Sequence, residues 1–167
     1  MSNTRITELT RLFEAGRDHT LQILDTVPES HRHKQLQPGK ATPTWLLGHL
    51  TRTVDRLILE WTLQLDPVLP EETGIKFAPE HAGGVAPTTD PDAYPAWEDL
   101  RAAYVEATNR ALAGLGALKD SDLENPIPGD MPDNYRERFP KIETLLRLLP
   151  VHDAYHRGQM GMLAKLN

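Results

Sequence analysis

Apolar residues recur at intervals of three and four residues in four long segments of the chain. This spacing places them along one face of a helix with 3.6 residues per turn. The pattern predicts helices over residues 4–27, 43–65, 95–118 and 141–167.

Capping residues and prolines support these boundaries. Thr42 followed by Pro43 is typical of an N-cap and a first helical position. Pro28 stops the pattern of the first helix, and Pro140 is expected in the first turn of the fourth.

The connections between the predicted helices are long. Residues 66–94 are rich in Pro, Gly, Thr and Asp, show no clear period, and are expected to form an irregular loop. A second Pro- and Gly-containing connection covers residues 119–139. Four amphipathic helices without a convincing strand predict an all-α four-helix bundle with long connecting loops, as one domain over residues 1–167. The pattern does not choose among bundle topologies.

Two histidines interrupt the apolar face of the fourth helix. His152 and His156 are four residues apart, so they lie on adjacent turns of one face. That face also carries Leu145, Leu148, Leu149, Met160 and Leu163. A buried imidazole without a partner is costly, because it loses its hydrogen bonds to water. Either polar side chains satisfy this pair or a metal ion does, and the spacing leaves both alternatives open.

A metal site in a bundle normally takes further ligands from a facing helix. His49 in the second helix is the best candidate, and Gly48 before it would let another backbone approach closely. His19 in the first helix is a weaker candidate. The remaining histidines, His31, His33 and His81, fall in polar connections and are expected to be solvated. Three imidazoles suit zinc, nickel or iron equally well.

Composition limits the possible partners. The chain has 167 residues, a formal net charge of −6 and no cysteine. The net negative charge argues against nucleic acid or an anionic membrane as a partner. The absence of cysteine excludes zinc–thiolate sites and a nucleophilic thiol of the protein's own. The N-terminus does not resemble a signal peptide, and no run reaches the ~18–20 apolar residues of a spanning helix. We therefore expect a soluble, cytoplasmic protein.

Two motifs carry a family resemblance. The first is Gly48-His49-Leu50, and the second is the stretch HDAYHRGQ over residues 152–159. With the order and length of the helices, these motifs resemble the DinB-like superfamily of metal-binding four-helix bundles. The resemblance implies a divalent metal held by His49, His152 and His156, with its remaining positions open to water or substrate. It also implies a homodimer. Several relatives are thiol S-transferases or isomerases that use a low-molecular-weight thiol.

The leading hypothesis is a metal-dependent thiol S-transferase or isomerase that acts on a small molecule. Gln159 shares the histidine face and Tyr155 lies at its edge, so both are expected to contact substrate. Arg52 and Arg56 follow His49 on its flank, where they either receive the carboxylates of a thiol or remain solvated. The sequence assigns no catalytic residue.

The main alternative is a non-catalytic, metal-binding dimer associated with stress. Metal-assisted hydrolysis needs a general base, and Glu60 lies about three turns from His49 along the helix. In the metalloprotease motif H-E-x-x-H a glutamate follows the first histidine, where this chain has Asp153, which argues against that class. A purely structural bundle, in which the histidines make core hydrogen bonds, also remains open.

Overall fold

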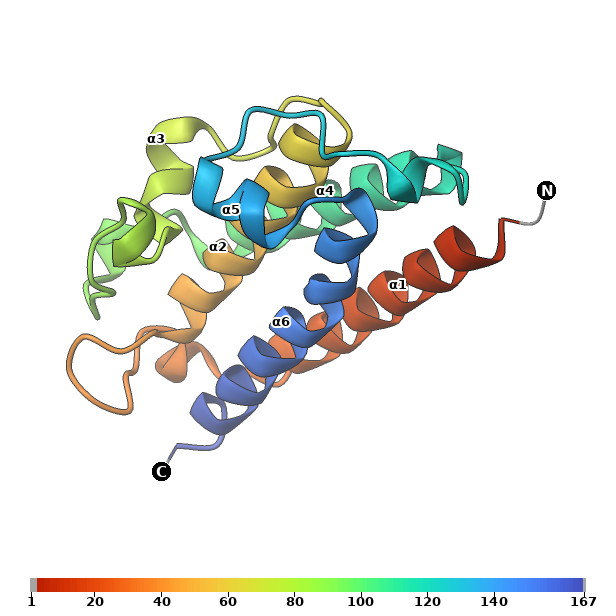
Figure 1. Ribbon diagram of the computed structural model, residues 1–167. Helices are drawn as coiled ribbons and strands as arrows, with labels where there is room; N and C mark the ends of the chain where they lie inside the picture. The colour runs from red at the N-terminus through yellow and green to blue at the C-terminus, as the bar shows by residue number, and fades with distance from the viewer. Residues whose placement is uncertain (1–2, 167) are drawn as a thin grey trace.

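The computed structural model describes residues 3–166 and shows an all-helical protein, with no strand in that range. Four long helices form the bundle: α1 (Thr4–Leu24), α2 (Pro43–Thr53), α4 (Trp97–Ala117) and α6 (Ile142–Leu163). The predicted all-α bundle is therefore confirmed (Figure 1).

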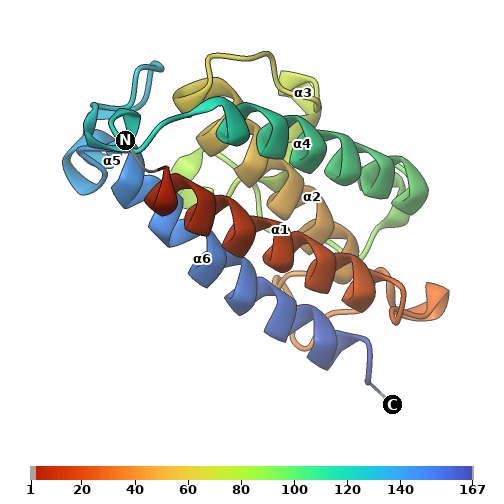
Figure 2. The same cartoon turned by 90° about the vertical axis from the view of Figure 1, so that its right-hand side faces the viewer.

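The four long helices pack in the order α1, α4, α2, α6 around the bundle. Both α1 and α2 make their main contacts with α4 and α6. Figure 2 shows α1 in front, with α4 above it, α6 below it and α2 behind. The connections from α1 to α2 and from α4 to α6 therefore cross the bundle diagonally, which explains why both are long. The pattern of apolar residues left this topology undecided.

The predicted start of α2 is confirmed. The Thr42 hydroxyl accepts a hydrogen bond from the Trp45 backbone N–H at 3.1 Å, and Pro43 occupies the first helical position. At α6 the prediction that Pro140 lies in the first turn was wrong, because the helix begins at Ile142. The backbone N–H of Lys141 donates to the Thr144 hydroxyl at 3.3 Å and makes Lys141 the N-cap, so Pro140 precedes the helix.

The second half of the predicted second helix is a π-helix, η2 (Val54–Thr62), which continues directly from α2. A π-helix bonds residue i to i+5, and its wider turn re-aims the side chains that follow. Asp55 is buried here, and its two carboxylate oxygens accept the backbone N–H groups of Val68 and Leu69, each at 3.0 Å. The chain after the helix is thereby fastened to the bundle.

The connection expected as an irregular loop over residues 66–94 contains four short helical turns: α3 (Glu71–Gly74), η3 (Ile75–Phe77), η4 (Glu80–Ala82) and η5 (Pro91–Ala93). Each turn is too short to show a helical period, which is why the pattern missed them. The segment packs on the bundle, because Phe77 and Ala78 are fully buried. The second connection contains η6 (Asp122–Glu124) and α5 (Asp133–Arg138).

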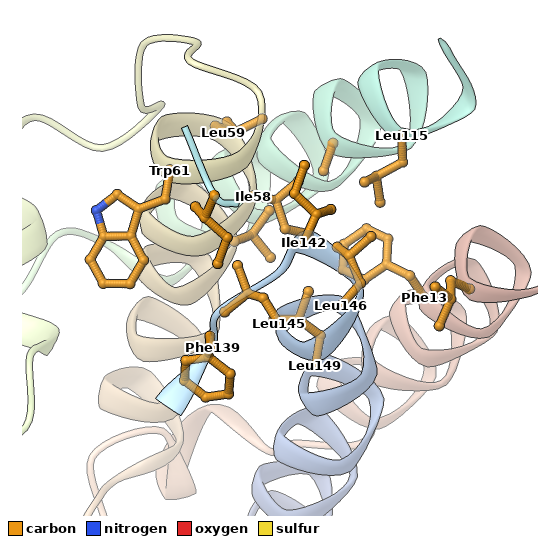
Figure 3. Close-up of a cluster of buried hydrophobic side chains, with 14 of the residues drawn as sticks. Phe13, Ile58, Leu59, Trp61, Leu115, Phe139, Ile142, Leu145, Leu146 and Leu149 are labelled. Carbon is orange, nitrogen blue, oxygen red and sulfur yellow. The ribbon is translucent and has the colours of Figure 1, made fainter. Parts of the chain in front are cut away.

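The core consists of two clusters of buried side chains. The first contains Phe13, Ile58, Leu115 and Leu145, contributed by α1, η2, α4 and α6 (Figure 3). The second surrounds Leu50, Phe77, Tyr104 and Met160. Along α6 the first cluster ends at Leu149 and the second begins at Met160. The histidine pair of α6 therefore lies between the two clusters. Within the described residues, no helix combines the length and apolar character needed to cross a membrane.

Candidate metal centre

His49, His152 and His156 converge on one point inside the bundle. The Nε2 atom of His152 lies 3.2 Å from the Nε2 atom of His49 and 3.2 Å from that of His156. One nitrogen from each ring lies within 4.8 Å of the other two. α2 supplies His49 and α6 supplies the other two. The structure thus brings together the three residues that the sequence predicted as metal ligands, in a geometry that can hold a metal ion.

Hydrogen bonds on the far side of two rings fix which nitrogen faces this point. Nδ1–H of His49 donates to the backbone carbonyl of Phe77 at 2.9 Å. Nδ1–H of His156 donates to the side-chain oxygen of Gln159 at 2.7 Å. A carbonyl oxygen can only accept, so the proton of each neutral ring sits on Nδ1 and its Nε2 presents a lone pair. Such outer partners are typical of metal-bound histidines.

The third ring differs, because Nδ1 of His152 is buried and has no hydrogen-bond partner. Nδ1 of His152 lies 3.5 Å from a carboxylate oxygen of Asp153, which is buried. If Nε2 of His152 carried the proton, that single N–H could be directed at only one of its two Nε2 neighbours. A metal ion at the point where the three rings converge could instead be bound by the Nε2 atoms of all three histidines. Histidine nitrogens that bind one zinc ion at about 2.1 Å are separated by about 3.0–3.4 Å, so the two separations of 3.2 Å from His152 fit, and the His49 and His156 nitrogens lie within 4.8 Å of each other.

Burial keeps the imidazoles of His49 and His156 neutral. Desolvation, together with the neighbouring imidazoles, lowers the pKa of His49 to about 3. The same two causes lower the pKa of His156 to about 4. Neutral imidazole is the form that binds a metal ion. At neutral pH, His49 and His156 therefore need no deprotonation before a cation binds.

Packing holds the His49 ring in place. The Trp45 indole stacks on it, with ring centroids 4.8 Å apart and planes 8° apart. Gly48 leaves room for another part of the chain, as predicted, but a side chain fills it. The Phe77 ring lies where a Cβ on residue 48 would be. Trp45 lies four residues before His49, so helical spacing could have revealed this contact. No pattern of nearby residues in the sequence predicts that Phe77 packs at Gly48.

The other histidines do not join the cluster. His19 is exposed on α1. His31 and His33 are half-buried rather than solvated, and burial lowers the pKa of His33. His81 is exposed and borders the cavity described next.

The three histidines line one wall of a cavity of about 370 Å³. Its other lining residues are Trp45, Arg52, Thr53, Arg56, Leu57, Trp61, Pro79, His81, Tyr135, Arg138, Phe139 and Leu148. Most of these side chains are apolar or aromatic, which is typical of a small-molecule site. A metal bound by the three histidines would be reached from this cavity.

Tyr155 and Gln159 lie on another side of the histidines. They border a separate hollow of about 400 Å³, together with Lys40 and Leu163. The Gln159 amide nitrogen donates to the Tyr155 hydroxyl at 3.3 Å, while its oxygen accepts from His156. Gln159 therefore orients a histidine. Contact of either side chain with a substrate stays a prediction.

Fold and site together define an all-α bundle with a triad of one buried and two half-buried histidines beside an open cavity. The sequence profile of the DinB superfamily matches residues 12–160, which is most of the chain. The protein belongs to the DinB superfamily. A comparison with curated proteins finds no match.

Proposed function

We propose that this protein is a divalent-metal-dependent enzyme, a thiol S-transferase or isomerase, that acts on an electrophilic small molecule with a low-molecular-weight thiol. The observation that carries the proposal is the convergence of one ring nitrogen from each of three histidines at the wall of an open cavity. A divalent ion with three protein ligands keeps at least one position for an exogenous ligand. When bound there, the ion would lower the pKa of a thiol so that the thiolate exists at neutral pH.

The protein's own residues are expected to bind and orient the reactants. Leu57, Trp61 and Leu148 form apolar parts of the cavity wall and would exclude water from the reacting atoms. The sulfur would give up its proton to solvent and use an electron pair to form a carbon–sulfur bond. In a transfer, the leaving group would depart with the electron pair of the broken bond. The chain has no cysteine, so the thiol must be supplied as a cosubstrate.

Two observations favour thiol transfer over the alternatives. No aspartate or glutamate is among the described residues that line the cavity, and Glu60 is paired with Arg56 at 3.0 Å. Hydrolysis would need a base at that place. A cavity of about 370 Å³ beside the triad argues against a metal enclosed by protein alone, which the non-catalytic alternative expects.

The test is conjugation of 1-chloro-2,4-dinitrobenzene to a panel of thiols, namely cysteine, glutathione and coenzyme A, followed by absorbance. We expect the wild-type protein, reconstituted in turn with zinc, nickel or iron, to accelerate at least one conjugation. His156→Ala should abolish the acceleration while its circular dichroism spectrum stays helical, and His19→Ala on the exposed face of α1 should not change it. Equal rates in the wild type and His156→Ala would contradict the proposal. Homodimer formation, which the family resemblance implies, is proposed as well, and light scattering tests it.

A further inference from the structure

The cavity beside the histidine triad has the opposite charge to the protein as a whole. The chain carries a formal net charge of −6. Yet Arg52, Arg56 and Arg138 line the cavity, and none of its described lining residues is acidic. A cleft lined by one sign of charge concentrates ligands of the opposite sign. This contrast points to an anionic ligand.

The charge of Arg52 is compensated only in part, by the nearby carboxylates of Glu71 and Glu60. It lies three residues after His49, one turn along the same face of α2. Its side chain is half-buried, and among residues 3–166 no carboxylate lies within ion-pair distance of its guanidinium. Burial and the nearby Arg56 lower the pKa of Arg52. A partly desolvated cation without a counter-ion is costly, and a bound anion would offset that cost.

Arg56 differs from Arg52 in having protein partners. Its guanidinium pairs with Glu60 at 3.0 Å and lies 3.9 Å from Glu71. It also lies 5.9 Å from the centre of the Trp61 ring. Arg56 is therefore already engaged, whereas Arg52 has no ion-pair partner in the described chain and can receive a ligand.

The wall contributed by α5 adds a second cation and an aromatic surface. Arg138 lies with its guanidinium 5.2 Å above the Phe139 ring, and no carboxylate in the described chain pairs with it. Tyr135 meets Trp61 edge to face, with ring centroids 5.3 Å apart. The cavity thus offers cationic groups from α2 and α5 and an aromatic surface beside them.

We infer that the cavity selects a small organic anion with an aromatic or apolar body, whose carboxylate or phosphate binds Arg52 and whose body packs against Trp61 and Tyr135. A guanidinium can bind either group through two parallel N–H donors. The inference rests on the proposed function in one respect, because it places the reacting atom of this substrate beside the histidine triad. It adds the chemical class of the substrate.

The experiment measures binding by isothermal titration calorimetry with three matched probes. These are 3-phenylpropionate, its neutral analogue 3-phenylpropionamide, and 2-phenylethylphosphonate. The proteins are the wild type as purified, the wild type after metal removal by a chelator, Arg52→Gln, Arg52→Lys, and the control Arg147→Gln. Arg147 is exposed on α6 and lies outside the cavity. Thermal melting verifies that each variant is folded.

We expect at least one anion to bind about tenfold or more tightly than the amide, and Arg52→Gln to weaken that anion about ten- to a hundredfold. Arg52→Lys should keep part of the affinity, and Arg147→Gln all of it. The stronger of the two anions identifies the charged group of the substrate. Equal binding of the amide and both anions, or unchanged binding in Arg52→Gln, would overturn the inference.

The titration of metal-free protein distinguishes a failure of this inference from a failure of the proposed function. A carboxylate that binds only the metal would lose its affinity on metal removal and keep it in Arg52→Gln, which would also overturn the inference. If instead the protein carries no metal and transfers no thiol, but anion binding still depends on Arg52, the proposed function fails and the anion site stands.

Discussion

The imidazole of His49 and the backbone carbonyl of Phe77 are joined by a hydrogen bond of 2.9 Å, although 28 residues separate them in the sequence. The Phe77 ring packs at the same time on Gly48, the residue next to His49. The connection between α2 and α4 therefore both fixes the proton of His49 on Nδ1 and buttresses the helix that carries it. A segment that composition alone describes as a loop thus shapes the histidine triad.

Gly48→Ala should destabilise the protein and disturb the site. The new methyl group would overlap the fully buried Phe77 ring. Overpacking costs about 1–3 kcal/mol and alanine contributes ~1 kcal/mol to a helix, so we expect a net loss of up to about 2 kcal/mol in urea unfolding. Gly161→Ala is the matched control, because a Cβ there meets no atom within 4 Å. Similar effects of the two substitutions on stability would contradict this account.

Asp55→Ala should release the start of the same connection. The substitution leaves the backbone N–H groups of Val68 and Leu69 without their carboxylate acceptor. We expect a loss of about 2–4 kcal/mol in the free energy of unfolding, measured with urea. Asp18→Ala, on the exposed side of α1, should change it by less than about 0.5 kcal/mol. A loss at Asp55 as small as that at Asp18 would show that the carboxylate does not anchor the segment.

Gln159→Leu should weaken metal binding without removing a ligand. The Gln159 oxygen is the acceptor for Nδ1–H of His156 at 2.7 Å. Loss of such an outer partner typically lowers metal affinity about ten- to a hundredfold. Competition with a chromogenic zinc chelator measures the change, and Gln159→Glu, which keeps an acceptor oxygen, should stay close to the wild type. Equal zinc affinity in Gln159→Leu and the wild type would remove Gln159 from the support of the site.

The metal-free protein should lose stability as the pH falls from about 6.5 toward 4. In the folded state the pKa of His49 is lowered to about 3 and that of His156 to about 4, from an ordinary value of 6.5. Within this window the unfolded chain binds protons that the folded chain does not, so acid favours unfolding. Each fully shifted histidine contributes at most about 1.4 kcal/mol per pH unit.

Urea unfolding of the metal-free wild type and of His49→Gln at pH 7 and pH 5 tests this linkage. The variant lacks one of the shifted groups, so its stability should decline less between the two pH values. A parallel decline in both proteins would mean that His49 is not the source of the pH dependence.

The sequence predicted those parts of the fold that depend on local pattern. The periodicity of apolar residues located all four long helices, and Thr42 marked the start of α2. The spacing of His152 and His156 predicted that both rings would face one side of α6, and the choice of His49 as their partner followed from a helix that had to face them. These features arise from interactions between residues a few positions apart.

The rest of the site depends on contacts that no local pattern encodes. The Phe77 carbonyl reaches His49 only because the π-helix and Asp55 redirect the chain after α2. The apolar pattern over residues 54–62 fits an α-helix equally well. Tyr135 and Arg138 border the cavity because α5, a helix of six residues, packs against η2. Such a short element has no detectable period.

The most direct test of the proposed metal site is the metal content of protein purified without a histidine tag, measured by elemental mass spectrometry. We expect close to one zinc, nickel or iron ion per chain, and none in the variant with His49, His152 and His156 all replaced by alanine. Absence of metal from the wild type, together with no thermal shift on adding these ions, would contradict the proposal that the three histidines bind a metal ion. The three imidazoles would then be hydrogen-bonding groups of the core.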